Sequence, residues 1–229
     1  MPERAARGHS RASGGHRAGG VHALSVADAT RLQECVLAGG VAVFPSDTVY
    51  GVCCDPDDRD AVARLYELKG RPAAHAAAVM FFSARRAMEE LTDLAEAERA
   101  ALRALLPGPV TLLLANPARR FAPACGADPA TLGLRVPLLG ENLAALASVT
   151  VPVMQSSANL SGRPEARTLA AVPRRLRAGA DLVLDGGKLP GTPSTVVDLR
   201  RYAAGRGWSV LREGALSRAA VERALERAR

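Results

Sequence analysis

Residues 41–51 read Val-Ala-Val-Phe-Pro-Ser-Asp-Thr-Val-Tyr-Gly, a short apolar run followed at once by a polar loop. The apolar residues 41–44 predict a buried strand, and Pro45 ends it. Hydroxyl groups then recur at every second position, at Ser46, Thr48 and Tyr50. Because alternate side chains of an extended segment point to the same side, we expect these hydroxyls to face one small polar ligand. A turn that ends the strand and carries incidental hydroxyls is the alternative interpretation.

Outward from this stretch, helices and strands alternate along the chain. Periodic apolar residues and a capping box from Ser25 to Asp28 predict helices at 25–38, 57–68, 84–91, 94–106, 139–148, 168–178 and 217–228. Short apolar runs predict strands at 41–44, 77–82, 110–114, 131–136, 151–154, 181–184, 194–199 and 208–212. Because no regular βαβ repeat appears, we expect one α/β domain with a twisted, mixed sheet and flanking helices.

The composition excludes several classes of protein. Of the 229 residues, 48% are hydrophobic and 23% are charged, so a core can form, and with only 3% aromatic residues it must be aliphatic. No apolar run reaches the roughly 18 residues of a membrane helix, and no secretory signal precedes the domain, so a cytoplasmic protein is expected. The sequence has no P-loop and no GxGxxG fingerprint. No CxxC pair occurs and three of the four histidines precede residue 23, so neither a metal motif nor a Ser–His–Asp triad is expected.

The formal net charge of +7 fits an anionic ligand or a nucleic acid. Part of this charge falls in residues 1–22, which are rich in Gly, Ser, Arg and His and are expected to form a disordered basic arm. The arm either touches RNA or is an unselected leader. We expect a folded domain after this arm and a final helix at 217–229. Lysine occurs only at Lys69 and Lys188 in a chain that otherwise uses arginine, which draws attention to Lys69.

Two cations stand at the end of a predicted helix, in Glu67-Leu-Lys-Gly-Arg-Pro72. Lysine supplies a point charge and arginine a bidentate fork, so Lys69 and Arg71 form a candidate phosphate clamp. A helix end whose cations complement the helix dipole is the alternative.

Other polar segments follow predicted strands. Ser156-Ser-Ala-Asn-Leu-Ser-Gly162 presents hydroxyls, an amide and a glycine that suit phosphate oxygens, although a helix cap or polar turn has the same composition. Thr131 and Arg135 share one face of a strand, where an arginine needs an anion such as a ligand carboxylate. Two further polar segments are Pro193-Ser-Thr-Val-Val-Asp198 and Val210-Leu-Arg-Glu-Gly214.

In order and spacing, these segments resemble the YrdC-like family of threonylcarbamoyl-AMP synthases, from about residue 23 to 216. The segments that carry the resemblance are VAVFPSDTVYGV, ELKGRP, LLPGPVTLLL, TLGLRVP, PVMQSSANLSGRP, DLVLDGG, PSTVVDL and VLREGAL. The family's K-x-R and S-x-N signatures correspond to Lys69-Gly-Arg71 and Ser157-Ala-Asn159. The resemblance implies a single YrdC-like domain whose curved sheet encloses a positively charged cavity.

The resemblance also implies an activity. A nucleotidyltransferase of this family makes L-threonylcarbamoyladenylate from L-threonine, bicarbonate or CO2, and ATP, with Mg²⁺ assisting and pyrophosphate released. The product serves the threonylcarbamoyl modification of tRNA adenosine by a separate transferase, and weak tRNA binding is a further expectation. Two alternatives remain: a carbamoyl-adenylate-forming paralogue with another acceptor, and a non-catalytic RNA-binding module.

Residue roles follow from the same resemblance. It implies that Lys69 and Arg71 are the catalytic residues and that they act on the triphosphate. It implies ATP contacts for Lys69, Arg71, Thr131, Ser157, Asn159 and Arg212. It implies threonine contacts for Ser46, Thr48, Tyr50, Arg135 and Ser194. No direct metal motif is present, so Mg²⁺ is expected to bind mainly through ATP, with Ser157 and Asn159 as possible ligands. The sequence departs from the family pattern at Ser46, His75, Met80 and Gln155, which leaves the amine acceptor open.

Overall fold

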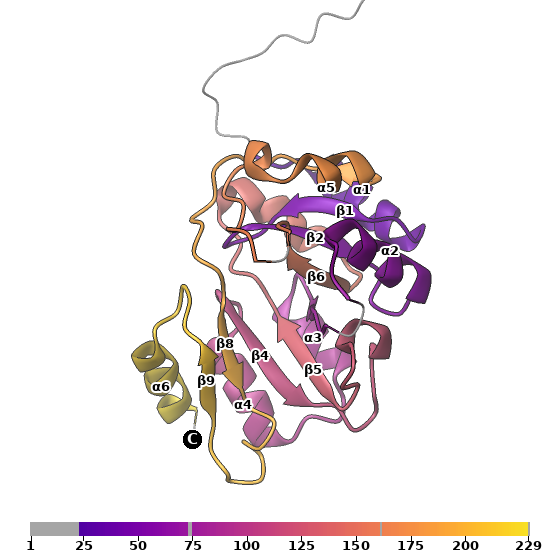
Figure 1. Cartoon of the computed structure of the whole chain (residues 1–229). Coiled ribbons are helices and arrows are strands. Elements are labelled where there is room, and N and C mark those ends of the chain that lie inside the picture. The colour runs from indigo at the N-terminus through magenta and orange to yellow at the C-terminus, as the bar shows by residue number, and fades with distance from the viewer. Residues whose placement is uncertain (1–22, 73–74, 161, 229) are drawn as a thin grey trace, which may run out of the picture.

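Helices and strands alternate along the described part of the chain, which comprises residues 23–72, 75–160 and 162–228 of this computed structural model (Figure 1). The predicted arm, residues 1–22, lies outside the described residues. The α-helices are α1 (Val26–Leu37), α2 (Arg59–Lys69), α3 (Ala84–Glu90), α4 (Glu96–Leu105), α5 (Arg174–Gly179) and α6 (Arg218–Arg227). The 3-10 helices are η1 (Ala122–Cys125), η2 (Glu141–Ser148) and η3 (Leu169–Ala171).

Within the described residues, nine strands form one sheet in the order β7-β1-β2-β6-β3-β5-β4-β8-β9. The strands are β1 (Ala42–Pro45), β2 (Tyr50–Cys54), β3 (Ala78–Met80), β4 (Val110–Ala115), β5 (Thr131–Arg135), β6 (Val153–Ser157), β7 (Leu182–Val183), β8 (Thr195–Asp198) and β9 (Ser209–Arg212). β1 pairs in parallel with β7 and antiparallel with β2, while β5 pairs in parallel with β3 and antiparallel with β4. These directions confirm the predicted mixed sheet.

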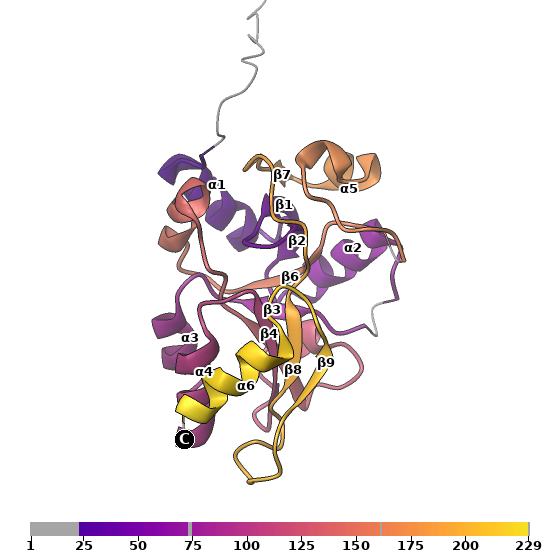
Figure 2. The same cartoon turned by 90° about the vertical axis from the view of Figure 1, so that its left-hand side faces the viewer.

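The sheet twists strongly from one edge to the other. In Figure 1, β1, β2 and β6 lie across the upper part of the molecule, whereas β4, β5, β8 and β9 run down its lower part. Neighbouring strands rotate by roughly 20–25° each, and this rotation accumulates over the sheet. Figure 2 shows α3, α4 and α6 together on one side of the lower strands, while α1, α2 and α5 surround the upper strands.

Local sequence signals set the ends of α1 and α2. The Ser25 Oγ accepts the Asp28 N–H at 3.2 Å, and the Ser25 N–H donates to Asp28 Oδ2 at 2.9 Å, which confirms the predicted capping box. Asp58 caps α2 in a similar way through backbone N–H groups of its first turn. Gly70 ends α2 with φ +60° and ψ 38°, a left-handed conformation that glycine adopts without a Cβ clash.

The segment after β1 turns back instead of continuing as an extended run. Residues 46–49 form a tight turn, in which the Ser46 Oγ donates to the Val49 carbonyl at 2.8 Å. β2 then pairs antiparallel with β1. The prediction that the three hydroxyls share one side holds for Ser46 and Thr48, whose hydroxyl oxygens lie 3.2 Å apart. It is wrong for Tyr50, whose hydroxyl donates to Asp185, because side chains alternate regularly only along an extended strand.

Three predicted elements differ in extent or type. The strand predicted at 151–154 instead extends to Ser157 as β6, because it pairs with both β2 and β3. The helix predicted at 168–178 is interrupted at Pro173, which has no N–H to donate, and only η3 and the short α5 form. The helix predicted at 139–148 is the 3-10 helix η2.

The core between the sheet and the helices is aliphatic, as the scarcity of aromatic residues predicts. Valine, leucine and alanine dominate the buried side chains of the described residues. The four cysteines are free thiols, and burial raises the pKa of Cys53, Cys54 and Cys125. None of the helices in the described ranges has the length and apolar character needed to cross a membrane.

Candidate active site

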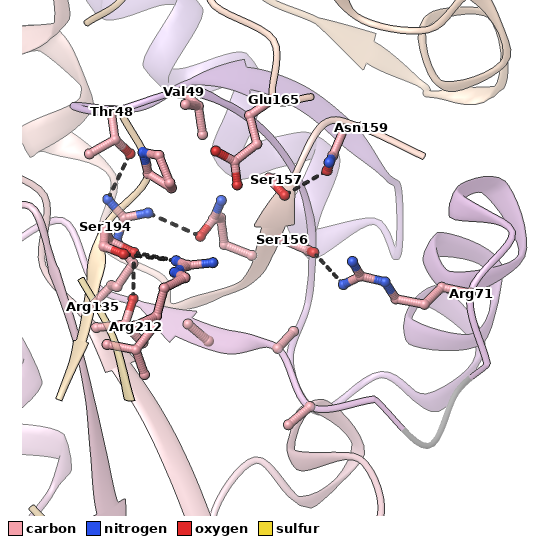
Figure 3. Close-up of a pocket in the computed structure, with 17 residues that line it drawn as sticks. Thr48, Val49, Arg71, Arg135, Ser156, Ser157, Asn159, Glu165, Ser194 and Arg212 are labelled. Atoms are coloured by element: carbon pink, nitrogen blue, oxygen red, sulfur yellow. Dashed lines mark hydrogen bonds between the residues drawn. The ribbon is translucent and has the colours of Figure 1, made fainter. Parts of the chain in front are cut away.

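One pocket gathers side chains from segments far apart in the sequence (Figure 3). It has a volume of about 250 Å³ and lies where the turn before β2, the end of α2, the strands β4, β5, β6, β8 and β9 and the loop after β6 meet. Its lining residues include seven that the sequence singled out: Thr48, Arg71, Arg135, Ser157, Asn159, Ser194 and Arg212. The remaining lining residues are Val49, Ala76, Ala77, Ala78, Thr111, Gln155, Ser156, Glu165, Pro193 and Val196.

Arg135, the last residue of β5, stands on one side of the pocket. Its side chain is almost fully buried and pairs with Asp47, with 2.6 Å between Nη2 and Oδ1. The same nitrogen donates to Thr48 Oγ1 at 3.2 Å, and Nη1 donates to Gln155 Oε1 at 3.4 Å. The contact with Gln155 is long and therefore weak, which leaves Nη1 free to serve an anion in the pocket.

Burial and pairing compete in the Asp47–Arg135 pair. Burial lowers the pKa of Arg135, and Asp47 opposes this effect. Burial likewise raises the pKa of Asp47, while Arg135 and the Leu138 N–H act to lower it. Because an arginine keeps its proton in proteins, the guanidinium remains charged, and the adjacent carboxylate fixes its orientation.

Arg71 stands on the other side of the pocket, immediately after α2. Its Nη1 lies 3.5 Å from Ser156 Oγ, and its buried Nε has no partner among the described residues. Beside it, Ser157 Oγ donates to Asn159 Oδ1 at 2.7 Å (Figure 3). A weakly engaged guanidinium next to hydroxyl and amide groups is well suited to phosphate oxygens.

Lys69 supports this side of the pocket from behind the lining residues. Its Nζ donates to the Asn159 carbonyl at 3.0 Å and also to the Ser157 carbonyl. Burial, and to a smaller extent the charge of Arg71, lower the pKa of Lys69 to about 7, while Glu165 acts to raise it. The lysine therefore holds the backbone that presents Ser157 and Asn159, and it contributes a titratable charge near the pocket.

Strands β8 and β9 close the third side. Arg212 Nη2 donates to the Ser194 carbonyl at 2.8 Å and lies 3.4 Å from its Oγ. The Ser194 Oγ is 2.9 Å from Thr111 Oγ1, so these two hydroxyls share a hydrogen bond. Arg212 is exposed, and this contact aims it across the pocket mouth (Figure 3).

Besides Lys69, three residues with predicted ligand contacts lie away from the described pocket lining. Ser46 is buried within the turn of residues 46–49. The Tyr50 hydroxyl donates to Asp185 Oδ1 at 2.8 Å, and burial and this carboxylate raise its pKa. Thr131 stands at the far end of β5, where its Oγ1 donates to Asp128 Oδ2 at 2.7 Å. Ser46 and Tyr50 shape the turn that presents Thr48, whereas Thr131 faces a different surface.

The departures from the family pattern fall in different environments. Gln155 lines the pocket and contacts Arg135. Met80 is fully buried in the core, and His75 is exposed with its Nδ1 3.3 Å from the Pro72 carbonyl. Of the departures, Gln155 is therefore the one in contact with the predicted carboxylate site.

Sequence reasoning missed three residues that shape the pocket. Asp47 lies inside the quoted polar loop, and a carboxylate beside predicted hydroxyl ligands was the signal for an arginine partner. Thr111 carried no such signal, because its proximity to Ser194 depends on the pairing of β4 with β8. Glu165 carried none either, because it reaches the pocket from the loop after β6. Within the described ranges, no group of three or more His, Cys, Asp or Glu residues could hold a metal ion.

The fold and the pocket define a class of protein, an α/β domain with an arginine-lined pocket at one side of a twisted mixed sheet. A model of the Sua5/YciO/YrdC family, described as telomere recombination, matches residues 34–214, and the chain belongs to this family. The resemblance found in the sequence is thereby confirmed. The chain is 35% identical over 164 residues to the threonylcarbamoyl-AMP synthase of Thiobacillus denitrificans, covering 70% of this chain and 85% of that relative.

Solved structures agree with this assignment. A variant of Pyrococcus abyssi Sua5 superposes with a TM-score of 0.74 at 29% identity, covering 87% of this chain and 60% of that longer protein. Sua5 of the same organism complexed with L-threonine gives a TM-score of 0.71 at 28% identity and covers 88% of this chain and 58% of Sua5. Escherichia coli YciO superposes with a TM-score of 0.68 at 26% identity, covering 83% of this chain and 91% of YciO.

Proposed function

We propose that this chain is an ATP-dependent nucleotidyltransferase that makes L-threonylcarbamoyladenylate from L-threonine, bicarbonate or CO2, and ATP. The observation that carries the proposal is the placement of Arg135 and Arg71 on opposite sides of one pocket (Figure 3). One guanidinium suits an amino-acid carboxylate and the other suits phosphates. The names of the matched synthases and the threonine complex of Sua5 support the choice of substrates.

The pocket divides into two substrate regions under this proposal. Arg135 holds the threonine carboxylate through Nη1, and the hydroxyls of Thr48 and Ser194 border the threonine side chain. Arg71, Ser157, Asn159 and Arg212 border the nucleotide phosphates. Lys69 acts through its charge and through the backbone it holds. Ser46 and Tyr50 are positioning residues for the Thr48 turn.

The chemistry requires positioning more than a nucleophilic side chain. The threonine ammonium first loses a proton to water, and the free amine then attacks the carbon of CO2, so that a C–N bond forms as one C–O π bond opens. Loss of a second proton from the nitrogen to water gives the carbamate. A carbamate oxygen then attacks the α-phosphorus, and the bond to the bridging oxygen breaks to release pyrophosphate. Fixed cations stabilise the charge that develops on the phosphate oxygens, and orientation removes the entropic barrier.

The side chains present fit a magnesium ion that arrives with ATP. Mg²⁺ prefers oxygen ligands and in nucleotide sites takes most of them from phosphates and water. The Ser157 hydroxyl and the Asn159 amide oxygen are the protein oxygens on the phosphate side, and Asn159 Oδ1 already accepts one hydrogen bond there. When bound, the ion would neutralise phosphate charge.

The proposed product is a mixed anhydride, so its consumer must be a group-transfer enzyme. We assign that step to a separate transferase that modifies a tRNA adenosine, and we place the synthesis in the cytoplasm, where ATP and tRNA meet. Binding of tRNA by this chain is proposed to be weak, because Arg71, Arg135 and Arg212 line a small pocket.

The test is pyrophosphate release from ATP and bicarbonate, with and without L-threonine. Release that depends on L-threonine supports the proposal. Release that requires another amine or carbamoyl phosphate would assign carbamoyl-adenylate chemistry with a different acceptor. Absence of release with any acceptor, together with salt-sensitive tRNA binding, would replace both enzyme functions with an RNA-binding role.

Replacement of Arg71 tests the phosphate side directly. We expect Arg71→Ala to lower threonine-dependent turnover by at least about tenfold, since a charged hydrogen bond to phosphate is worth roughly 1.5–3 kcal/mol. Unchanged circular dichroism would show that the fold persists. The control is Arg223→Ala, an exposed arginine on α6 that should keep full activity. Equal activity of the two variants would contradict the assignment of Arg71.

A further inference from the structure

Glu165 is the one carboxylate among the described residues that line the pocket, which it shares with three arginines. Figure 3 shows its carboxylate pointing into the space between Thr48 and Ser157, and no hydrogen bond joins it to the other residues drawn there. It is partly buried. A carboxylate in a site built for anions needs an explanation, because it opposes the binding of phosphates.

The backbone around Glu165 is fixed on both sides. The Tyr50 N–H donates to the carbonyl of Ala166 at 2.9 Å, and Ala166 is buried. On the other side, the Asn159 side chain donates to the carbonyl of Arg163. These contacts tie the loop to β2 and to the residues just after β6, so the backbone at Glu165 is held beside the pocket.

Glu165 acts on cations from both halves of the pocket. It opposes the effect of burial on the pKa of Lys69 and on the pKa of Arg135. It therefore stands electrostatically between the proposed phosphate side and the proposed carboxylate side. Like charges repel strongly at short range inside a protein, so a bare phosphate beside Glu165 is disfavoured.

A ligand that fits this position carries a positive group for Glu165 next to a negative group for Arg135. A zwitterion has this arrangement of charges. We propose that Glu165 binds the α-ammonium group of the amino-acid substrate while Arg135 binds its carboxylate, so that the two side chains together select a zwitterionic acceptor. This inference rests on the proposed function. It deepens that function by naming the residue that holds the reacting nitrogen.

A magnesium ion is the competing partner for Glu165. A magnesium ion bound to ATP takes negatively charged oxygen ligands from the phosphates, so it does not depend on Glu165. The other oxygen atoms of the described lining side chains are neutral hydroxyl and amide oxygens. The amine nitrogen of an α-amino acid, by contrast, is bound to the carbon next to its carboxylate. A carboxylate anchored on Arg135 therefore brings its own ammonium into the same pocket, and Glu165 is the acceptor there.

The test is a binding measurement by calorimetry in the presence of Mg²⁺ and a non-hydrolysable ATP analogue. L-threonine is compared with (R)-3-hydroxybutanoate, which keeps the carboxylate and the hydroxyl and lacks the amine. We expect the protein to bind L-threonine at least about tenfold more tightly, and Glu165→Gln to reduce this ratio toward one. Glu165→Asp should restore part of it. Glu34→Gln, at an exposed position on α1, should keep the full ratio.

Three results would overturn the inference. If Glu165→Gln keeps the full preference for L-threonine, Glu165 does not bind the ammonium group, and the proposed function is unaffected. Weaker affinity for Mg²⁺ and the ATP analogue with unchanged threonine affinity assigns Glu165 to the metal instead. Failure of the unmodified protein to bind L-threonine, although it binds the ATP analogue, overturns the inference and the proposed acceptor together.

Discussion

The Asp47–Arg135 pair shows how one residue contact serves both stability and function. Both side chains are 4% exposed, and they pair at 2.6 Å. A buried guanidinium without a counter-ion would carry a large desolvation cost, so Asp47 makes the burial of Arg135 possible. The Leu138 N–H donates to the second Asp47 oxygen at 3.0 Å, which fixes the carboxylate. The pair therefore presents a rigid cation to the pocket.

Asp47→Asn should lower the free energy of unfolding by about 3–5 kcal/mol, because it leaves a buried arginine uncompensated. The measurement is equilibrium unfolding in urea. The matched control is Glu89→Gln, which breaks the exposed pair of Arg85 and Glu89 on α3 and should cost less than about 1 kcal/mol. Similar small losses in both variants would show that Asp47 and Arg135 are not coupled as the structure places them.

Lys69 provides a second prediction at the residue scale. Its pKa of about 7 means that the side chain is mostly neutral at pH 8. Bound triphosphate favours the charged amine and raises its pKa, so ATP binding at pH 8 should take up about one proton. Calorimetry in two buffers of different ionisation enthalpy measures this uptake. Lys69→Met should abolish it, whereas Lys188→Met, at the other lysine, should preserve it. Uptake that persists in Lys69→Met would assign the proton to another group.

Linkage also gives the sign of the stability effect at Lys69. Its folded pKa lies below the unfolded value of 10.5, so the unfolded chain binds more protons above pH 7. The destabilisation is full below pH 7 and is relieved as pH rises. Between pH 7 and 8, the free energy of unfolding should therefore rise with pH because of Lys69. This rise should be absent in Lys69→Met.

At the element scale, the conformation at the end of α2 sets the position of Arg71 in the pocket. Gly70 adopts φ +60°, and its N–H donates to the Glu67 carbonyl at 2.9 Å, while the Arg71 N–H donates to the Tyr66 carbonyl at 3.0 Å. This turn reverses the chain at once after Lys69. It thereby separates a buried lysine from an arginine that lines the pocket, although the two are only two positions apart.

Gly70→Ala should lower the free energy of unfolding by about 1–2 kcal/mol, because a Cβ is strained in the left-handed region. Apart from its neighbours in the chain, no atom of the described residues lies within 4 Å of the position that a Cβ would take, so the cost comes from the backbone. Gly70→Asn should lose less, since asparagine tolerates this conformation. Urea unfolding measures both variants, and the KM for ATP should rise in the order of the strain. A loss in Gly70→Asn as large as in Gly70→Ala would point to a different cause.

The elements that the sequence predicted well are those with local signals. Ser25 marks the start of α1 and Gly70 the end of α2, and these signals act within a few residues. Tyr50–Cys54 was missed as β2, and β6 was ended too early, because both depend on pairing between distant segments. The same reason applies to the site. Lys69 and Arg71 look equivalent in the sequence, and only the fold shows that Lys69 is buried while Arg71 lines the pocket.

At the scale of the whole molecule, the pocket joins the two halves of the twisted sheet. Thr48, Ser157 and Asn159 belong to the upper strands and their loops, whereas Ser194 and Arg212 come from the β8 and β9 edge (Figure 1). Ligands that bridge these groups bind only the folded chain, so they should stabilise the domain as a unit.

ATP analogue with Mg²⁺ and L-threonine, each at about 100 times its Kd, should each raise the melting temperature by about 5–10 °C. Hydrogen exchange should slow in residues 155–160 and also in 193–196 and 209–212, since the ligands contact both halves. Arg135→Gln should remove the increase in melting temperature that L-threonine causes and keep the increase that the ATP analogue causes, because Arg135 stands on the carboxylate side. D-threonine is the control, since its carboxylate and ammonium cannot meet Arg135 and Glu165 with the side chain in the same place. Protection confined to residues 155–160 would mean that the ligands occupy only the upper half, and the two-sided pocket would have to be abandoned.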